Sequence, residues 1–135
     1  DAHKCEALDG ANELLSFLKT QKIPTAIITR NCEQAARIKL DKTAIDTDIL
    51  ITREYFPAKP DPSALQYVAQ QWRNNTSELL FVGDYRYDLE AAFNAQMPSC
   101  LVHQQEIQDF TNLATFSSRD LVSLKHDLKP FIHRN

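Results

Sequence analysis

Apolar positions along the chain switch between two spacings, and this switching predicts helices and strands in turn. The first apolar set recurs every three or four residues, at Ala11, Leu14, Leu15 and Leu18. That spacing indicates an amphipathic helix, and Asp9 is its expected N-cap. The next run, TAIIT at residues 25–29, is β-branched and is typical of a buried strand. A second helix is expected from a cap at Asn31 to about Leu40.

The same alternation continues to the end of the chain. Further strands are expected at residues 48–52 (DILIT), 79–83 (LLFVG), 100–102 (CLV) and, more weakly, 114–116. Further helices are expected from apolar sets at Ala64, Leu65, Val68, Ala69 and Trp72, then Leu89, Ala92 and Phe93, then Leu121, Leu124 and Leu128. Alternating strands and helices with short connections favour βαβ units. The sequence therefore predicts one α/β domain over residues 1–135, with a Rossmann-like parallel sheet and helices on both faces.

Composition narrows the class of protein. Hydrophobic residues make up 43% and charged residues 24% of the 135 positions, which is ordinary for a globular domain. The net charge of −3 gives no reason to expect a nucleic-acid partner. No apolar run approaches the roughly 20 residues that span a bilayer, so no membrane partner is expected. Oligomeric state is not indicated.

The cysteines indicate the location of the protein, and the start of the chain indicates that the sequence is part of a longer one. Cys5, Cys32 and Cys100 are few and scattered, which favours reduced thiols and a cytoplasmic location. The chain begins at Asp1 and its one methionine is Met97. We therefore expect it to be the C-terminal part of a longer chain.

Polar residues with chemical potential follow the predicted strands. Thr29 ends one strand, Asp84 follows another, and Lys59 lies just before a helix. Ligands of open α/β sheets bind outside the carboxyl ends of the strands. We therefore expect these three residues to converge on one rim of the sheet.

The stretch FVGDYRYDLEAA, residues 81–92, carries the most specific chemistry. Gly83 is one of only two glycines, and it allows a close approach of the backbone to a neighbour. Asp84 and Asp88 offer the hard oxygen ligands that Mg²⁺ takes. Taken alone, the motif fits equally well a turn at Asp84 and a helix cap at Asp88.

The other two groups are ambiguous in isolation. Lys59 in KPDP could stabilise a phosphoryl group, or be a surface lysine before a proline-stiffened helix. Thr29, Arg30 and Asn31 could form an anion site at a helix start, or an ordinary turn.

In their order and spacing, however, the groups resemble the haloacid dehalogenase superfamily, especially its phosphoglycolate phosphatase-like branch. The resemblance rests on AIIT ending at Thr29, Lys59 in KPDP, and GDYRYD with Asp84 and Asp88, and it runs from about residue 8 to about residue 128. It implies a phosphatase that acts on a small phosphorylated substrate through an aspartyl phosphate with Mg²⁺.

The resemblance also implies a role for each matching residue. Thr29 would hydrogen-bond a phosphoryl oxygen as a catalytic residue, with Arg30 and Asn31 lining the substrate phosphate. Lys59 would stabilise charge on the phosphoryl group and the nucleophile. Asp84 would bind Mg²⁺, supported by Asp88.

The first motif of the family, an apolar strand followed by D-x-D-G-T, has no match. The one D-x-D, at residues 46–48, precedes its strand and would face the wrong end of the sheet. We therefore expect the first strand and the cap to be absent, and the chain as written to be inactive. The alternative is a non-catalytic phosphate-binding or interaction module derived from the same fold.

Two smaller features complete the sequence. Gln96 stands where the family commonly has glycine at a helix end, which predicts some backbone strain. The opening DAHK resembles the amino-terminal copper and nickel site of serum albumin. That site requires Asp1 to be the true terminus, and we do not expect it to be the biological role.

Overall fold

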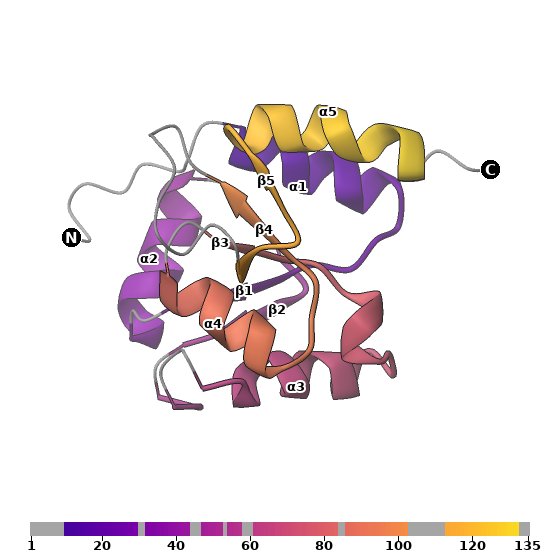
Figure 1. Cartoon of the computed structure of the whole chain (residues 1–135). Helices are drawn as coiled ribbons and strands as arrows, with labels where there is room; N and C mark the ends of the chain where they lie inside the picture. The colour runs from indigo at the N-terminus through magenta and orange to yellow at the C-terminus, as the bar shows by residue number, and fades with distance from the viewer. Residues whose placement is uncertain are drawn as a thin grey trace. The chain divides into compact units, whose positions relative to one another are not determined.

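The computed structural model describes residues 10–29, 32–43, 47–52, 54–57, 61–83, 86–102 and 113–132. The chain divides into two compact units. The first comprises Asp1–Tyr55 with Asp120–Asn135, and the second comprises Phe56–Arg119. Figure 1 shows the order of the elements along the chain.

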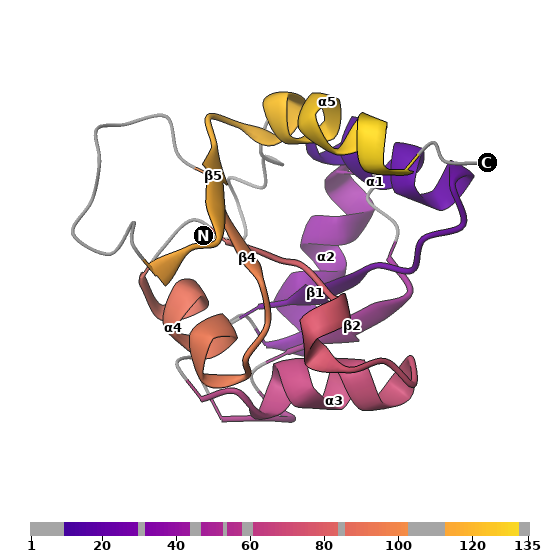
Figure 2. The same ribbon diagram turned by 45° about the vertical axis from the view of Figure 1, so that its right-hand side comes forward.

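Within its described residues, the first unit has a short parallel sheet and three helices. Strands β1 (Ala26–Ile28) and β2 (Ile49–Ile51) pair in parallel, with Ile28 opposite Ile51, and α2 (Glu33–Thr43) connects them. Helices α1 (Ala11–Thr20) and α5 (Leu121–Ile132) lie side by side in both ribbon views (Figures 1 and 2). Leu14 of α1 and Leu124 of α5 are buried. The two helices therefore supply part of the core of this unit.

The N-cap of α1 is Gly10, so the expectation of Asp9 is wrong. Gly10 has a φ of +88°, a conformation that favours glycine. A Cβ placed on Gly10 would lie 2.7 Å from Cγ2 and 2.9 Å from the backbone N of Val122 in α5. The packing of α5 against the start of α1 therefore favours glycine at position 10. A capping pattern in the sequence does not reveal a contact with a residue as distant in the chain as Val122.

The second unit contains a three-stranded parallel sheet, in the order β3 (Phe81–Gly83), β4 (Ser99–Val102) and β5 (Phe116–Ser118). Helix α4 (Arg86–Asn94) connects β3 to β4 and contacts both strands (Figure 2). Every residue of β4 is buried. Helix α3 (Ser63–Gln71) and the short 3₁₀ helix η1 (Thr76–Glu78) precede the sheet.

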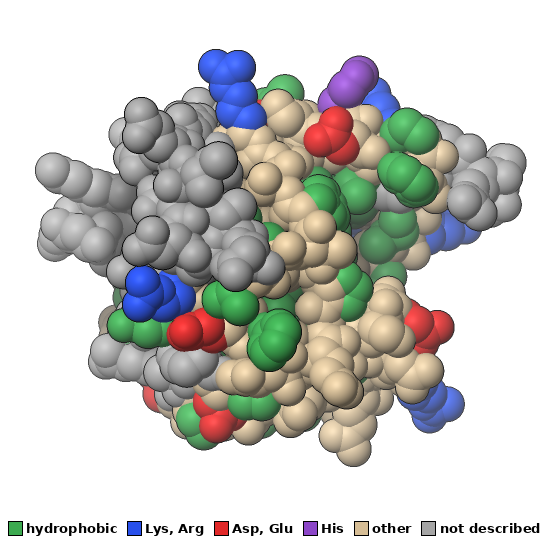
Figure 3. All heavy atoms as spheres, in the orientation of Figure 1, with side chains coloured by type: hydrophobic (Ala, Val, Ile, Leu, Met, Phe, Trp, Pro, Cys, Tyr) green, Lys and Arg blue, Asp and Glu red, His purple; other side chains and the backbone are tan. Residues whose placement is uncertain are grey.

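The α/β class and the parallel pairing are confirmed, while three details differ from expectation. Within the described residues the strands form two sheets, not one. The last strand is Phe116–Ser118, two residues later than expected. Phe93, expected on an apolar helix face, is 65% exposed. Hydrophobic side chains do reach the surface drawn in Figure 3.

One further expectation, at the end of α4, is met. Gln96 has a φ of +57° just after α4, so the predicted strain at this helix end is present. The amide of Met97 donates to the carbonyl of Ala92, which closes the helix end around Gln96. Among the described helices, none is long and apolar enough to cross a membrane.

Candidate functional site

The carboxyl end of the β1–β2 sheet holds Thr29. Its backbone N–H donates to the carbonyl of Ile51 at 2.9 Å, so the ladder continues one residue past β1. Helix α2 begins four residues later at Glu33. Thr29 therefore lies between the end of a strand and the start of the next helix along the chain.

The carboxyl end of β3 holds Gly83, and Asp88 lies directly against it. A Cβ on Gly83 would overlap the Cβ of Asp88 and lie 2.8 Å from its Cγ and Oδ2. Asp88 is the third residue of α4, which begins at Arg86, so it is not the cap of that helix. The glycine is therefore needed because a carboxylate packs on the backbone where the strand ends.

The KPDP stretch is described from Asp61 onward. The backbone N–H of Ser63 donates to Oδ1 of Asp61 at 2.8 Å, at the start of α3. Hydrogen bonds from the Ser63 side chain and backbone hold the pKa of Asp61 below its ordinary value. Asp61 therefore fixes the helix start that follows Lys59, a structural role that the sequence analysis did not assign.

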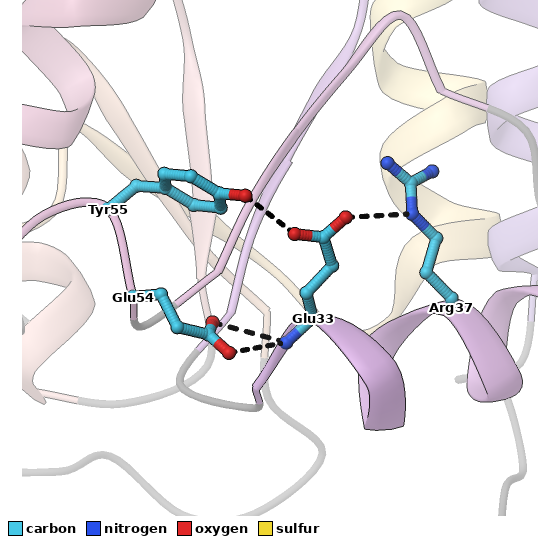
Figure 4. A network of polar contacts seen from close by, with 4 residues as sticks. All are labelled: Glu33, Arg37, Glu54 and Tyr55. Carbon is cyan, nitrogen blue, oxygen red and sulfur yellow. Dashed lines mark hydrogen bonds and ion pairs between the residues drawn. The ribbon is translucent and has the colours of Figure 1, made fainter.

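A polar cluster ties the turn after β2 to the first turn of α2 (Figure 4). The Glu33 backbone N–H donates to both carboxylate oxygens of Glu54, each at 3.1 Å. The Tyr55 hydroxyl donates to Oε1 of Glu33 at 2.6 Å. Arg37 forms an ion pair with Glu33 at 3.8 Å, and its exposure makes this contribution small. We call these four residues the Glu33 cluster.

The Glu33 cluster predicts a loss of stability at alkaline pH. The hydrogen bond to Glu33 and the charge of Glu33, with a smaller contribution from Glu54, raise the pKa of Tyr55 above its ordinary value, while Arg37 opposes this. A pKa raised by folding gives stability that is complete below the unfolded pKa of about 10 and disappears as pH rises through the folded value. We expect the stability advantage of the wild type over Tyr55→Phe in urea unfolding to be present at about pH 8 and lost above the folded pKa. An advantage that does not change with pH would contradict this.

Several predicted site residues lie outside the described part of the chain. These are Arg30, Asn31, Lys59 and Asp84, together with the DAHK start. Thr29 belongs to the first unit and Asp88 to the second. Their convergence on one rim therefore stays a prediction.

Of the D-x-D at residues 46–48, the structure describes Thr47 and Asp48. Asp48 precedes β2, and its Oδ2 accepts from the backbone N–H of Thr25, just before β1, at 2.8 Å. It therefore lies at the amino end of this sheet, opposite to Thr29. Among the residues that the structure describes, no three acidic, histidine or cysteine side chains gather into a metal-binding group.

Comparison with known proteins decides the family. The sequence model of the haloacid dehalogenase-like hydrolases matches residues 1–102. The chain belongs to this family. A haloacid dehalogenase-like hydrolase domain-containing protein of Arabidopsis thaliana is 29% identical over 102 residues, which are 75% of this chain and 42% of that protein. A phosphoglycolate phosphatase of Pseudomonas fluorescens is 35% identical over 96 residues, 68% of this chain and 35% of that enzyme.

Solved structures agree with the assignment. A hydrolase from Pseudomonas syringae superposes with a TM-score of 0.81 at 25% identity, covering 92% of this chain and 60% of that one. The chain spans less than half of the length of each of these two curated relatives. All three groups of predicted site residues, from Thr29 to Asp88, fall within the matched region.

Sequence reasoning missed the Glu33 cluster. Its members Glu33, Glu54 and Tyr55 are exposed or half-buried polar residues with no motif spacing. They meet because β1 and β2 pair in parallel, which places the segments after both strands at the same end of the sheet. A correct strand register was the one signal that could have indicated them.

Proposed function

We propose that the intact protein to which this chain belongs is a Mg²⁺-dependent phosphomonoester hydrolase that works through an aspartyl phosphate. The observation that carries the proposal is the packing of Asp88 on Gly83 at the end of β3. This close approach explains why the G-D-x-x-x-D motif needs its glycine. It also places the Asp88 carboxylate against Gly83, the residue that directly precedes Asp84 in the sequence. Family membership and the phosphoglycolate phosphatase relatives support the reaction class.

Each residue keeps the role that the resemblance implies. The Thr29 hydroxyl and the N–H groups at the start of α2 other than that of Glu33, which donates to Glu54, would hold phosphoryl oxygens, with Arg30 and Asn31 beside them. Lys59 would stabilise the charge that develops on the phosphoryl group. The nucleophilic aspartate has no counterpart in this chain, so covalent catalysis belongs to the intact protein.

Asp84 and Asp88 would hold Mg²⁺, because carboxylates are the oxygen ligands that this ion prefers. The ion would neutralise phosphoryl charge. The fit is supported by the chemistry of the Asp88 carboxylate and by its seat on Gly83, where no Cβ intrudes. We further propose a small phosphorylated substrate and a cytoplasmic location, the latter supported by the reduced state of Cys32 and Cys100.

Magnesium binding tests the proposed metal residues directly. We expect Asp84→Asn and Asp88→Asn to weaken Mg²⁺ binding by about 10- to 100-fold, because each removes a charged oxygen ligand or its support. Isothermal titration calorimetry of the chain with MgCl₂ measures the effect. Glu90→Gln is the matched control, since Glu90 is a carboxylate of the same helix outside the motif. Equal affinity in Asp84→Asn and the wild type would refute the metal assignment.

Hydrolysis tests the missing nucleophile. We expect the 135-residue chain to hydrolyse p-nitrophenyl phosphate with Mg²⁺ at the uncatalysed rate, because no aspartate can form the covalent intermediate. The release of p-nitrophenolate is followed by absorbance. Robust turnover that disappears in Asp84→Ala would show that the chain has a nucleophile after all.

A further inference from the structure

We propose that Glu54 and Tyr55 are positioning residues, which hold the start of α2 and the end of β1 in the geometry that binds a phosphoryl group. The inference rests on the proposed function for the identity of the ligand. It adds two residues that lie outside the family motifs, and it assigns them a task that acts through Thr29 and the first turn of α2.

The connection from β1 to α2 is fastened at both ends to the same neighbouring segment. At one end, the Thr29 N–H donates to the carbonyl of Ile51 at 2.9 Å. At the other end, the Glu33 N–H donates to Glu54 and the Glu33 carboxylate accepts from Tyr55. Ile51, Glu54 and Tyr55 therefore support both ends of the connection.

That support is itself anchored in the core of the first unit. Ile51 is 4% and Thr52 is 2% exposed at the end of β2. The backbone N–H of Tyr55 donates to the carbonyl of Thr52 at 3.2 Å, which closes the turn that carries Glu54. A buried strand end followed by a closed turn gives the exposed cluster a fixed base.

Anion binding at a helix start depends on N–H groups that are already oriented before the anion arrives. The Glu33 cluster orders the helix start that follows Thr29 and so lowers the entropic cost of binding. Its Glu54 carboxylate also has the wrong charge to attract an anion. Ordering and charge thus act in opposite directions at Glu54, and a neutral isostere separates them.

The variants are expected to fold, because the residues changed are exposed. Tyr55 is 60% exposed, and Glu54 is exposed as well. Glu54→Ala removes the acceptor for the Glu33 N–H, whereas Glu54→Gln keeps an acceptor oxygen and removes the charge. Tyr55→Phe removes one hydroxyl and leaves the ring. Glu13→Gln, an exposed carboxylate in α1, is the matched control.

The probe is sulfate, which stands in for the phosphoryl group and keeps its own charge unchanged at all working pH values. It is titrated into each protein while the Thr29 amide is followed by ¹⁵N NMR. We expect Glu54→Ala and Tyr55→Phe to weaken sulfate binding by about 2- to 10-fold, the equivalent of one hydrogen bond, in proteins that remain folded at the temperature of the titration. Glu54→Gln should bind at least as tightly as the wild type. Equal affinity across all variants, or a loss in Glu54→Gln equal to that in Glu54→Ala, would overturn the proposal.

Amide hydrogen exchange of Thr29 provides a second measurement that needs no ligand. We expect exchange to be about 2- to 10-fold faster in Glu54→Ala than in the wild type and Glu13→Gln, because the distant end of the connection is then released. Unchanged exchange would overturn the positioning role. A wild type that binds no sulfate but shows this exchange pattern would instead count against the proposed phosphate site, so the two failures are distinguishable.

Discussion

Replacing Gly83 by alanine is expected to destabilise the protein by about 1–3 kcal/mol or more and to abolish Mg²⁺ binding. The added methyl group would overlap the Cβ of Asp88, and that atom is attached to the backbone of α4. No side-chain rotation can move it away, so either α4 or the end of β3 must shift. Urea unfolding measures the first effect and titration with MgCl₂ the second.

Two further variants separate packing from chemistry at this position. Asp88→Ala removes the carboxylate without adding an atom, so we expect it to fold normally and to lose Mg²⁺ affinity. Gly83→Ala with Asp88→Gly moves the methyl group from the helix to the strand. It should recover part of the lost stability, less the cost of about 1 kcal/mol for glycine in a helix. A Gly83→Ala protein as stable as the wild type would show that Asp88 does not pack where the structure places it.

Replacing Leu89 by alanine is the second change with a large expected effect. Leu89 lies in α4 directly after Asp88, is completely buried and forms a cluster with Leu101 of β4. Leu113 and Ala114 pack against the pair. Truncation removes apolar contacts and leaves a cavity, so we expect a loss of about 2–5 kcal/mol in the free energy of unfolding.

Phe93→Ala in the same helix is the matched control for Leu89→Ala. Phe93 is 65% exposed, so its truncation should change stability by no more than about 0.5 kcal/mol. Both variants are measured by urea unfolding with tyrosine and tryptophan fluorescence. A smaller loss in Leu89→Ala than in Phe93→Ala would contradict the buried face assigned to α4.

Leu89 and Phe93 also show where predictions from sequence patterns fail. Leu89 and Phe93 are one helical turn apart, and both count as apolar in a periodicity argument. In the structure Leu89 is buried and Phe93 is exposed, while the alanines on either side of Phe93 in sequence, Ala92 and Ala95, are buried. The inward face of α4 therefore lies on the side of these alanines, and the large apolar residues alone did not indicate on which side of Leu89 that face continues.

Local signals were enough for the elements and their class. Short β-branched runs became strands, apolar spacings of three and four became helices, and the strand–helix alternation predicted parallel pairing correctly. The strain at Gln96 was predicted from the glycine that the family commonly has at this helix end, a position where a left-handed residue is frequent. These features depend on neighbours in sequence, and sequence therefore contains them.

The features of the candidate site also separate into those predicted from sequence and those that only the tertiary structure shows. The G-D-x-x-x-D motif alone suggested a metal site or a capped turn, and family membership followed from the order of three motifs. Only the tertiary structure decided that Gly83 is required by the side chain of Asp88, that packing of α5 selects Gly10 at the start of α1, and that Glu54 and Tyr55 support the start of α2. Each of these depends on a contact between side chains and backbone that only folding brings together, and no periodicity or spacing in the chain records such a contact.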